Sequence, residues 1–180
     1  KPGAIPFGIH MMIGKNHTTF MADTTINERP TAEELAYIAR ETAQVAKRMG
    51  HEPRVAFLSY STFGNPIGQW LENIRNAVAI LDAENPGFEY EGEMAPDAAL
   101  NPKVMALYPF SRLSGPANVL IMPGLQSANL SAKLLRELGG DATIGPMMIG
   151  MEKPVQIAPM TAIAPDVLTL AVLASAGVVG

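Results

Sequence analysis

Three polar loops, each expected at the end of a strand, hold the residues of this chain that could do chemistry. Hydroxyls, backbone amides and a following helix N-terminus are groups that bind phosphate or pyrophosphate. The same residue types are also ordinary turn and cap residues, so a purely structural role stays open. The loops and their candidate residues are residues 59–64 with Ser61 and Thr62, residues 123–129 with Asn129, and residues 145–153 with Gly145, Pro146 and Lys153.

Other ionisable side chains give weaker signals. Lys133 follows Asn129 by one helical turn, so it is either a phosphate contact or a solvated helix residue. The three histidines, His10, His17 and His51, are too scattered to indicate a metal site, and we expect each on the surface or in a turn. The chain has 0 cysteines, which excludes thiolate metal sites and a disulfide framework.

Short apolar runs alternate with amphipathic stretches, and together they must position these loops. Thr31 and Glu34 form a capping-box pattern that predicts a helix start, and Gly50 predicts its end. We predict strands over residues 5–13, 17–22, 54–60, 88–91, 118–122 and 144–149. We predict helices over residues 31–49, 69–81 and 129–138, a short one from Asn101-Pro102, and a last one from Pro165. The alternation indicates an α/β fold with a mostly parallel sheet flanked by helices.

The composition limits the function classes. The net charge is −4 without basic patches, which argues against nucleic acid as the main partner. No run approaches the roughly 18 apolar residues of a membrane span, and no signal peptide is visible, so we expect a cytoplasmic protein without membrane contact. Apolar residues make up 48% and charged residues 17%, which favours a large core or faces buried against partners.

Blocks of sequence in register resemble the phosphate acetyltransferase (phosphotransacetylase) family over about residues 1–175. Among them are Met21-Ala-Asp-Thr-Thr-Ile-Asn-Glu-Arg-Pro-Thr-Ala-Glu-Glu-Leu35, Pro53-Arg-Val-Ala-Phe-Leu-Ser-Tyr-Ser-Thr62 and Lys153-Pro-Val155. The resemblance implies the isocitrate/isopropylmalate dehydrogenase-like phosphotransacetylase fold. Residues 1–140 would be its second lobe, and residues 141–180 would return to a first lobe lying before Lys1.

The chain departs from the family where the family does chemistry. Active members carry a Ser-Arg pair that polarises the thioester and neutralises the phosphate, and here Pro159 and Met160 stand in its place. Neither side chain can donate a hydrogen bond or carry positive charge. Phe63 and Gly124 replace a usual cation and a usual Asp, whereas Asp166 falls where the family has a further active-site Asp. The resemblance therefore implies no catalytic residues.

The segments from Leu107 to Asn118 and from Lys153 to Pro159 are more similar to one subgroup, the C-terminal domain of large bacterial NADP-dependent malic enzymes. This likeness implies a non-catalytic, acetyl-CoA-sensing regulatory and oligomerisation domain. It would form a homo-oligomer. These domains would pair as a dimer, and the parent protein could assemble as a hexamer. The malic-enzyme domain of the same chain, with its NADP and divalent metal, would convert malate to pyruvate.

Two other readings stay open. One is a working phosphate acetyltransferase that makes acetyl phosphate and CoA from acetyl-CoA and phosphate. The other is a platform whose main role is oligomerisation through the apolar stretch of residues 167–179. For a CoA-like ligand, we expect the phosphates to meet backbone amides at a helix start at Asn129. The residues expected to bind it are Ser61, Thr62, Asn129, Lys133, Gly145, Pro146, Lys153 and Asp166.

Overall fold

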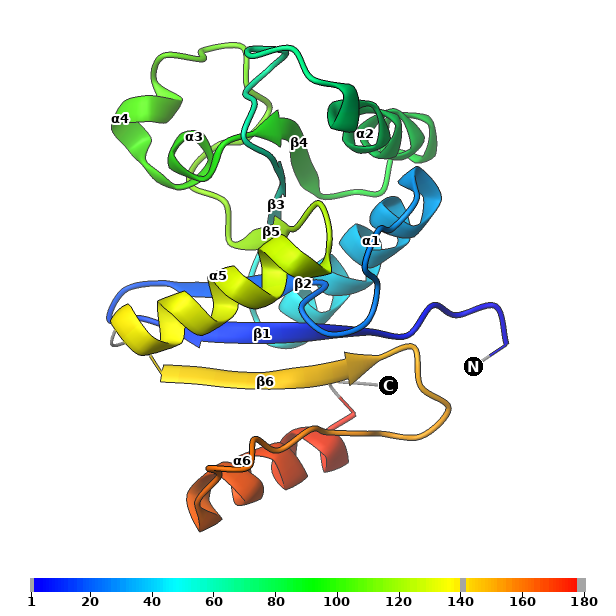
Figure 1. Cartoon of the computed structure of the whole chain (residues 1–180), viewed down its shortest axis with the longest axis vertical. Helices are drawn as coiled ribbons and strands as arrows, with labels where there is room; N and C mark the ends of the chain where they lie inside the picture. The colour runs from blue at the N-terminus through cyan, green and yellow to red at the C-terminus, as the bar shows by residue number, and fades with distance from the viewer. Residues whose placement is uncertain (1, 140–141, 178–180) are drawn as a thin grey trace.

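The computed structural model describes residues 2–139 and 142–177, which form one six-stranded sheet with helices on both faces (Figure 1). The strand order is β4-β3-β5-β2-β1-β6. The bounds are β1 Phe7–Ile13, β2 Thr18–Ala22, β3 Arg54–Leu58, β4 Glu89–Met94, β5 Val119–Ile121 and β6 Ala142–Ile149. The strands predicted from the sequence are all present, with ends shifted by a few residues.

Strand direction confirms the predicted mostly parallel sheet. The neighbours β4, β3, β5 and β2 pair in parallel, while β1 pairs antiparallel with both β2 and β6. Strand β1 is thus the one described strand that runs against the others. The carboxyl ends of the parallel strands therefore meet at one edge of the sheet, where ligands bind in open α/β folds.

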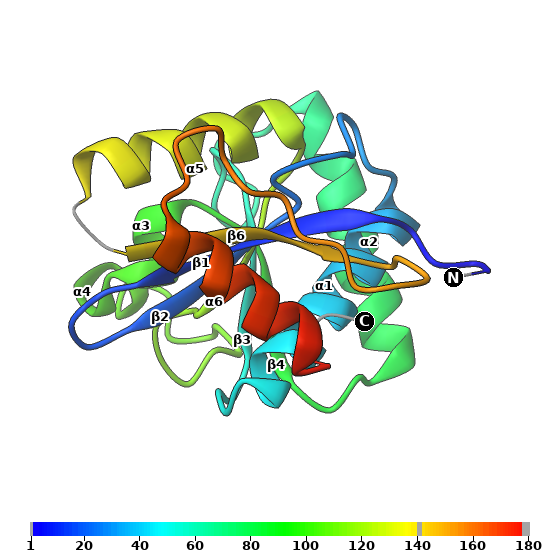
Figure 2. The ribbon, with the colours of Figure 1, turned by 90° about the horizontal axis from the view of Figure 1, so that it is seen from below.

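Helices divide between the two faces of the sheet. Helices α1 and α2 share one apolar core with β1, β2 and β6, and α3, α4 and α5 share the other. Helix α6 lies across β6 at the sheet's edge (Figure 2). The bounds are α1 Ala32–Arg48, η1 Gln69–Leu71, α2 Glu72–Glu84, α3 Pro96–Leu100, α4 Pro102–Met105, α5 Leu125–Leu138 and α6 Ala164–Ser175.

Helix α1 forms as its sequence predicts. The Thr31 side chain accepts a hydrogen bond from the Glu34 backbone N–H, and the Glu34 carboxylate accepts one from the Thr31 N–H. These bonds satisfy donors that a helix start leaves unpaired. Its apolar stripe, including Leu35 and Ile38, is buried against the sheet. Gly50, with φ of +84°, follows the last residues of the helix.

The start of one helix was predicted wrongly, and one short helix was missed. Helix α5 begins at Leu125, not at Asn129, and α3 was not predicted. No side chain caps the start of α5, so Pro123-Gly124 looks like an ordinary loop in the sequence. A Cβ on Gly124 would lie 2.7 Å from the Glu28 carbonyl oxygen, which explains the glycine. Because Asn129 lies beyond the first turn, backbone amides of a helix start are not available there.

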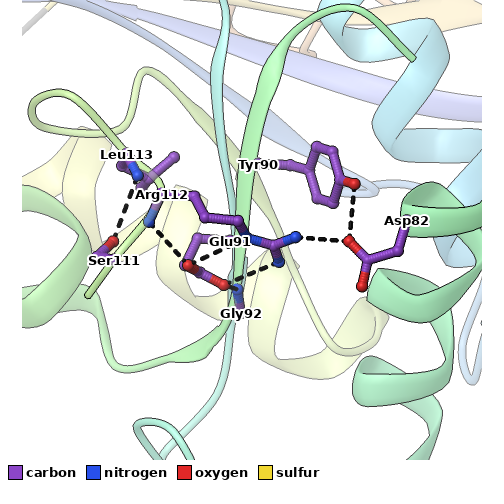
Figure 3. Close-up of polar contacts among 7 residues, drawn as sticks. All are labelled: Asp82, Tyr90, Glu91, Gly92, Ser111, Arg112 and Leu113. Carbon is purple, nitrogen blue, oxygen red and sulfur yellow. Dashed lines mark hydrogen bonds and ion pairs between the residues drawn. The ribbon is translucent and has the colours of Figure 1, made fainter. Parts of the chain in front are cut away.

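A polar network ties β4 to the segment after α4 (Figure 3). The Arg112 guanidinium donates to both carboxylate oxygens of Glu91, at 3.3 and 3.0 Å, and to Asp82 at 2.5 Å. Tyr90 donates its hydroxyl to the same Asp82 oxygen, at 2.8 Å. The Glu91 side chain is only 7% exposed, so Arg112 compensates a buried charge. This network holds residues 111–113 against the sheet.

The C-terminal part of the described chain is less enclosed. Strand β6 belongs to the same sheet as residues 2–139, and its pairing with β1 is extensive. Helix α6 has one buried residue, Leu170, and a partly buried Leu173 that packs against the core, whereas Val167, Leu168 and Val172 are exposed. The return of residues 141–180 to a further lobe stays a prediction, and Gly140 lies outside the described residues. No helix in the described part of the chain is long and apolar enough to cross a membrane.

Candidate functional site

A groove runs between α5, the β1–β6 edge of the sheet and α6, and it consists of two adjoining depressions. The first, about 200 Å³, is lined by His10, Thr24, Thr25, Asn129, Ala132, Lys133, Arg136, Thr143, Pro146 and Ile157. The second, about 540 Å³, is lined by His10, Arg136, Glu137, Ala142, Thr143, Ile144, Gly145, Pro159, Thr161, Asp166, Thr169 and Leu170. Because His10, Arg136 and Thr143 line both, the depressions form one continuous surface.

One face of α5 supplies the polar wall of the groove. Asn129, Lys133 and Arg136 are spaced by four and three residues, so their side chains share one side of the helix. The small residues Ala128 and Ala132 are buried beneath this wall, which lets the helix lie close to the sheet. The arrangement places two cations at the mouth of the groove, within reach of an anionic ligand.

The loop after β2 is held rigidly by Asp23. Its carboxylate accepts hydrogen bonds from the backbone N–H groups of Gly8, Thr25 and Asn27, at 2.9, 2.7 and 2.7 Å. This buried carboxylate therefore fixes the positions of Thr24 and Thr25, whose side chains line the groove. Asn129 donates its side-chain amide to the Thr24 carbonyl oxygen at 3.2 Å, which ties α5 to the same loop.

His10 is half-buried in β1, where it lines both depressions of the groove, so the prediction of a surface position or a turn was wrong for this histidine. The residues of β1 alternate between the two faces of the sheet, and His10 therefore points away from the core that contains Ile9 and Met11. Its Nδ1 lies 2.7 Å from the Thr24 hydroxyl oxygen. Burial, assisted by the positive charge of Arg136, lowers the pKa of His10 to about 4. The imidazole is therefore neutral at pH 7.

The structure brings five of the eight residues predicted to bind a ligand into the groove and leaves three outside it. Asn129, Lys133 and Pro146 line the first depression, and Gly145 and Asp166 line the second. Ser61, Thr62 and Lys153 line neither. Whether any of the eight contacts a ligand stays a prediction.

The three residues outside the groove are engaged elsewhere or exposed. The buried Ser61 hydroxyl donates to Glu93 at 3.1 Å, and Thr62 accepts a bond from the Ala95 N–H at 2.9 Å. Lys153 is exposed. Glu93 is 2% exposed; burial raises its pKa, but hydrogen bonds from Arg75, Gly64 and Ser61 outweigh burial and lower the pKa overall. These contacts make the residue 59–64 loop part of the scaffold.

Two of the groove residues, Gly145 and Asp166, also have a structural role. Gly145 has a φ of +128°, and a Cβ there would lie 2.6 Å from the Ile9 carbonyl oxygen, so only glycine fits this backbone. The Asp166 carboxylate accepts a hydrogen bond from the Ile163 N–H at 2.9 Å at the start of α6. Near them, Pro159 lines the groove and Met160 is exposed to solvent.

Several groove residues were missed by sequence reasoning: His10, Thr24, Thr25, Arg136 and Thr143. Arg136 could have been found, because it lies two turns after Asn129 on the same helical face. The others depend on the pairing of β1 with β2 and β6, which no local pattern reveals. Within the described residues, no group of three or more His, Cys, Asp or Glu side chains could hold a metal ion.

Comparisons with known proteins identify the family of this chain. The family described as phosphate acetyl/butaryl transferase matches residues 1–175. The chain is 52% identical over 175 residues to an NADP-dependent malic enzyme of Rhizobium meliloti, covering 97% of this chain and 23% of that protein. It is 39% identical over 144 residues to a phosphate acetyltransferase of Clostridium acetobutylicum, covering 79% of this chain and 43% of that protein. The chain thus spans less than half the length of these relatives.

The solved structures give the same result. A phosphotransacetylase from Streptococcus pyogenes superposes with a TM-score of 0.92 at 36% identity, covering 99% of this chain and 55% of that one. Together with the match over residues 1–175, this similarity confirms the fold that the resemblance implied. The chain belongs to the phosphate acetyl/butaryl transferase family.

Proposed function

We propose that this chain is a non-catalytic, acetyl-CoA-sensing regulatory domain of an NADP-dependent malic enzyme. The similarity to malic enzymes of Rhizobium meliloti and Rickettsia prowazekii, at 52% and 46% identity, supports the parent protein. In this proposal the parent oxidatively decarboxylates malate in the cytoplasm. Its NADP and divalent metal are bound by domains outside the sequence described.

The observation that carries the proposal is the pair Pro159 and Met160. Acyl transfer to phosphate needs donors aimed at the developing oxyanion and a cation beside the phosphate. Pro159 lines the groove and Met160 is exposed, yet neither side chain supplies such a group. Binding a thioester needs only ground-state contacts, so a domain can lose the transition-state groups and keep affinity.

The groove retains groups suited to a phosphorylated ligand. Lys133 makes no ion pair with any residue that the structure describes, and Arg136 contacts only the neighbouring Glu137, at 3.3 Å. Both Arg136 and Glu137 side chains are about half exposed or more, at 46% and 71%, so their pairing is weak. The cations are therefore available for phosphate oxygens, which each can meet by a charge-assisted hydrogen bond.

The position of the groove suggests how binding could be transmitted. Its walls come from α5, which packs on the sheet, and from α6, which has few buried side chains. A ligand that contacts both walls favours one placement of α6 over others. Since α6 also exposes Val167, Leu168 and Val172, such a bias could reach a neighbouring domain or subunit packed on it.

The direct test is calorimetric titration of acetyl-CoA into the intact parent protein, paired with malate decarboxylation assays. Binding is expected, together with a change in malate turnover. Lys133→Glu should weaken binding by about tenfold, because a charge-assisted hydrogen bond contributes roughly 1.5–3 kcal/mol. Lys103→Glu is the matched control, since Lys103 belongs to α4 and lies outside the groove. The absence of both binding and any effect on malate turnover would refute the proposal.

An active phosphate acetyltransferase is the second candidate, favoured by the placement of Asn129, Lys133 and Asp166 in the groove. Thiol release from acetyl-CoA in the presence of phosphate measures this activity. We expect none from the unmodified protein. Turnover by the unmodified chain would establish the enzyme, whereas turnover only in the Pro159→Ser, Met160→Arg double variant would support loss of catalysis in an intact binding site.

The proposal includes self-association. Exposed apolar side chains on α6, among them Leu168 at 65% and Val172 at 55%, are suited to burial against another chain or domain. Sedimentation velocity of the parent protein with and without Leu168→Glu measures the contribution of α6. A smaller assembly is expected for the variant, and an unchanged assembly would remove α6 from the interface.

A further inference from the structure

A separate depression of about 380 Å³ lies between the N-terminal ends of α1 and α2 and the loop after β5. It is lined by Arg29, Pro30, Leu35, Trp70, Asn73, Ile74 and Pro123. None of these residues lines the two depressions of the groove. Its size falls within the roughly 300–1,000 Å³ of small-molecule sites. In the described structure it is a second candidate binding site.

The floor and walls of this depression are rigid and apolar. Leu35 and Ile74, at 2% and 3% exposed, form part of the core beneath it. Pro30 and Pro123 have fixed backbone angles. Asn73 donates its side-chain N–H to the Pro30 carbonyl oxygen at 3.0 Å, which ties α2 to the loop before α1. The site is therefore formed before any ligand arrives.

The rim carries the groups that would select a ligand. Trp70, the single tryptophan of the chain, is 76% exposed, so its ring is open to a stacking partner. Arg29 is exposed and makes no ion pair or hydrogen bond with any other described residue. With the Asn73 amide oriented by its bond to Pro30, its oxygen accepts no hydrogen bond from the described residues.

These three groups match one ligand chemistry. A flat heteroaromatic base stacks on an indole ring, an exocyclic amine donates to an amide oxygen, and a guanidinium binds phosphate. We propose that this depression binds the adenine and phosphate of an adenine nucleotide. A free nucleotide would bind here independently of the proposed acetyl-CoA function, whereas the nucleotide end of a CoA thioester would rest on that function. Its nucleotide is either free or the nucleotide end of a CoA thioester extending from the groove, since Arg29 and Asn129 both line the shallow surface between the two sites.

The test is titration of the full protein with adenosine monophosphate, guanosine monophosphate and inorganic phosphate, followed by calorimetry and Trp70 fluorescence. Adenosine monophosphate should bind and change the fluorescence. Guanosine monophosphate should bind more weakly, because guanine presents an acceptor where adenine presents the amine. Trp70→Ala and Arg29→Ala should each weaken binding by about tenfold, as loss of a stacked base or a charged contact does.

The control is Arg48→Ala, which removes an exposed arginine of α1 that lines neither site. Competition by acetyl-CoA would identify the nucleotide end of a CoA thioester, and binding without competition would identify a free nucleotide. The inference would be overturned if adenosine monophosphate does not bind. It would also be overturned if Trp70→Ala, with an unchanged melting temperature, binds adenosine monophosphate as tightly as the wild type. Acetyl-CoA binding that depends on Lys133, together with no binding of adenosine monophosphate, would leave the proposed function standing and remove this site.

Discussion

Charged side chains are buried and paired at one edge of the sheet, and exposed without a buried partner among the described residues at the other. At β4, the carboxylates of Glu91 and Glu93 are buried and are paired with Arg112 and Arg75. At the β1–β6 edge, the groove cations Lys133 and Arg136 lack a buried partner among the described residues. The first arrangement holds the fold together, whereas the second leaves charge available for a ligand.

This contrast distinguishes scaffold from site better than residue type does. Both regions combine arginines, carboxylates and hydroxyls, and both lie beside loops that looked functional in the sequence. Burial of a charge has a large cost in free energy unless the charge is paired, so losing one partner of a buried pair destabilises the fold. The exposed cations of the groove, beside a neutral imidazole and two fixed threonines, can be removed without leaving a buried charge unpaired. The comparison predicts that substitutions at β4 change stability and that substitutions in the groove change binding.

The largest effect on stability is expected at Arg112. Arg112→Met removes the partner of the buried Glu91 and one partner of Asp82. Breaking a buried pair costs about 3–5 kcal/mol, and since the Arg112 side chain is 43% exposed, we expect about 3 kcal/mol. Urea unfolding measures the loss. A change below about 0.5 kcal/mol, the usual range of a neutral surface substitution, would contradict a scaffold role.

The second effect is a pH dependence that comes from His10. The pKa of His10 in the folded protein, about 4, lies below the ordinary histidine pKa of 6.5. Between these values the unfolded chain binds the proton more than the folded one, so stability is lost as the pH falls from 6.5 towards 4. The contribution lost between pH 7 and pH 4.5 is about 2 kcal/mol, because one pKa unit corresponds to 1.36 kcal/mol.

Unfolding of the wild type and of His10→Gln at the two pH values separates the contribution of His10 from that of the carboxylates, which titrate in the same range. The wild type should lose about 2 kcal/mol more than the variant between pH 7 and pH 4.5. Equal losses would show that folding does not lower the pKa of His10.

The smallest effect on stability is expected in the groove. Arg136→Met keeps most of the aliphatic stem and removes the charge, and the lost contact is an exposed pair with Glu137. Unfolding free energy should change by less than about 0.5 kcal/mol. A loss of stability as large as that of Arg112→Met would show that Arg136 stabilises the fold, and would refute the contrast between the groove and β4.

Much of the fold was predictable because its signals are local. The capping box at Thr31, the proline that opens α4 and the apolar runs of β3 and β5 each specify an element within a few residues. The start of α5 was not predictable in this way. It has no capping side chain, and its glycine is required by the approach of Glu28, a contact distant in sequence.

The candidate site was only partly predictable for the same reason. Asn129 and Lys133 share a helical face, so their convergence follows from spacing. His10, Thr24 and Thr143 meet only because β1 pairs with β2 on one side and β6 on the other. Ser61 looked available in the sequence, but the buried Glu93 occupies its hydroxyl. The sequence around Ser61 does not indicate this contact, because Glu93 is distant in the chain.

The groove cations Lys133 and Arg136 are expected to bind a ligand and not to stabilise the fold. The most direct measurement compares the melting temperature of the wild type with that of the Lys133→Met, Arg136→Met double variant, each with and without acetyl-CoA. A ligand that binds only the folded state raises the melting temperature. We expect equal melting temperatures without ligand, and a rise with acetyl-CoA in the wild type that is largely lost in the double variant. An equal rise in both proteins, or a double variant that already melts lower without ligand, would contradict it.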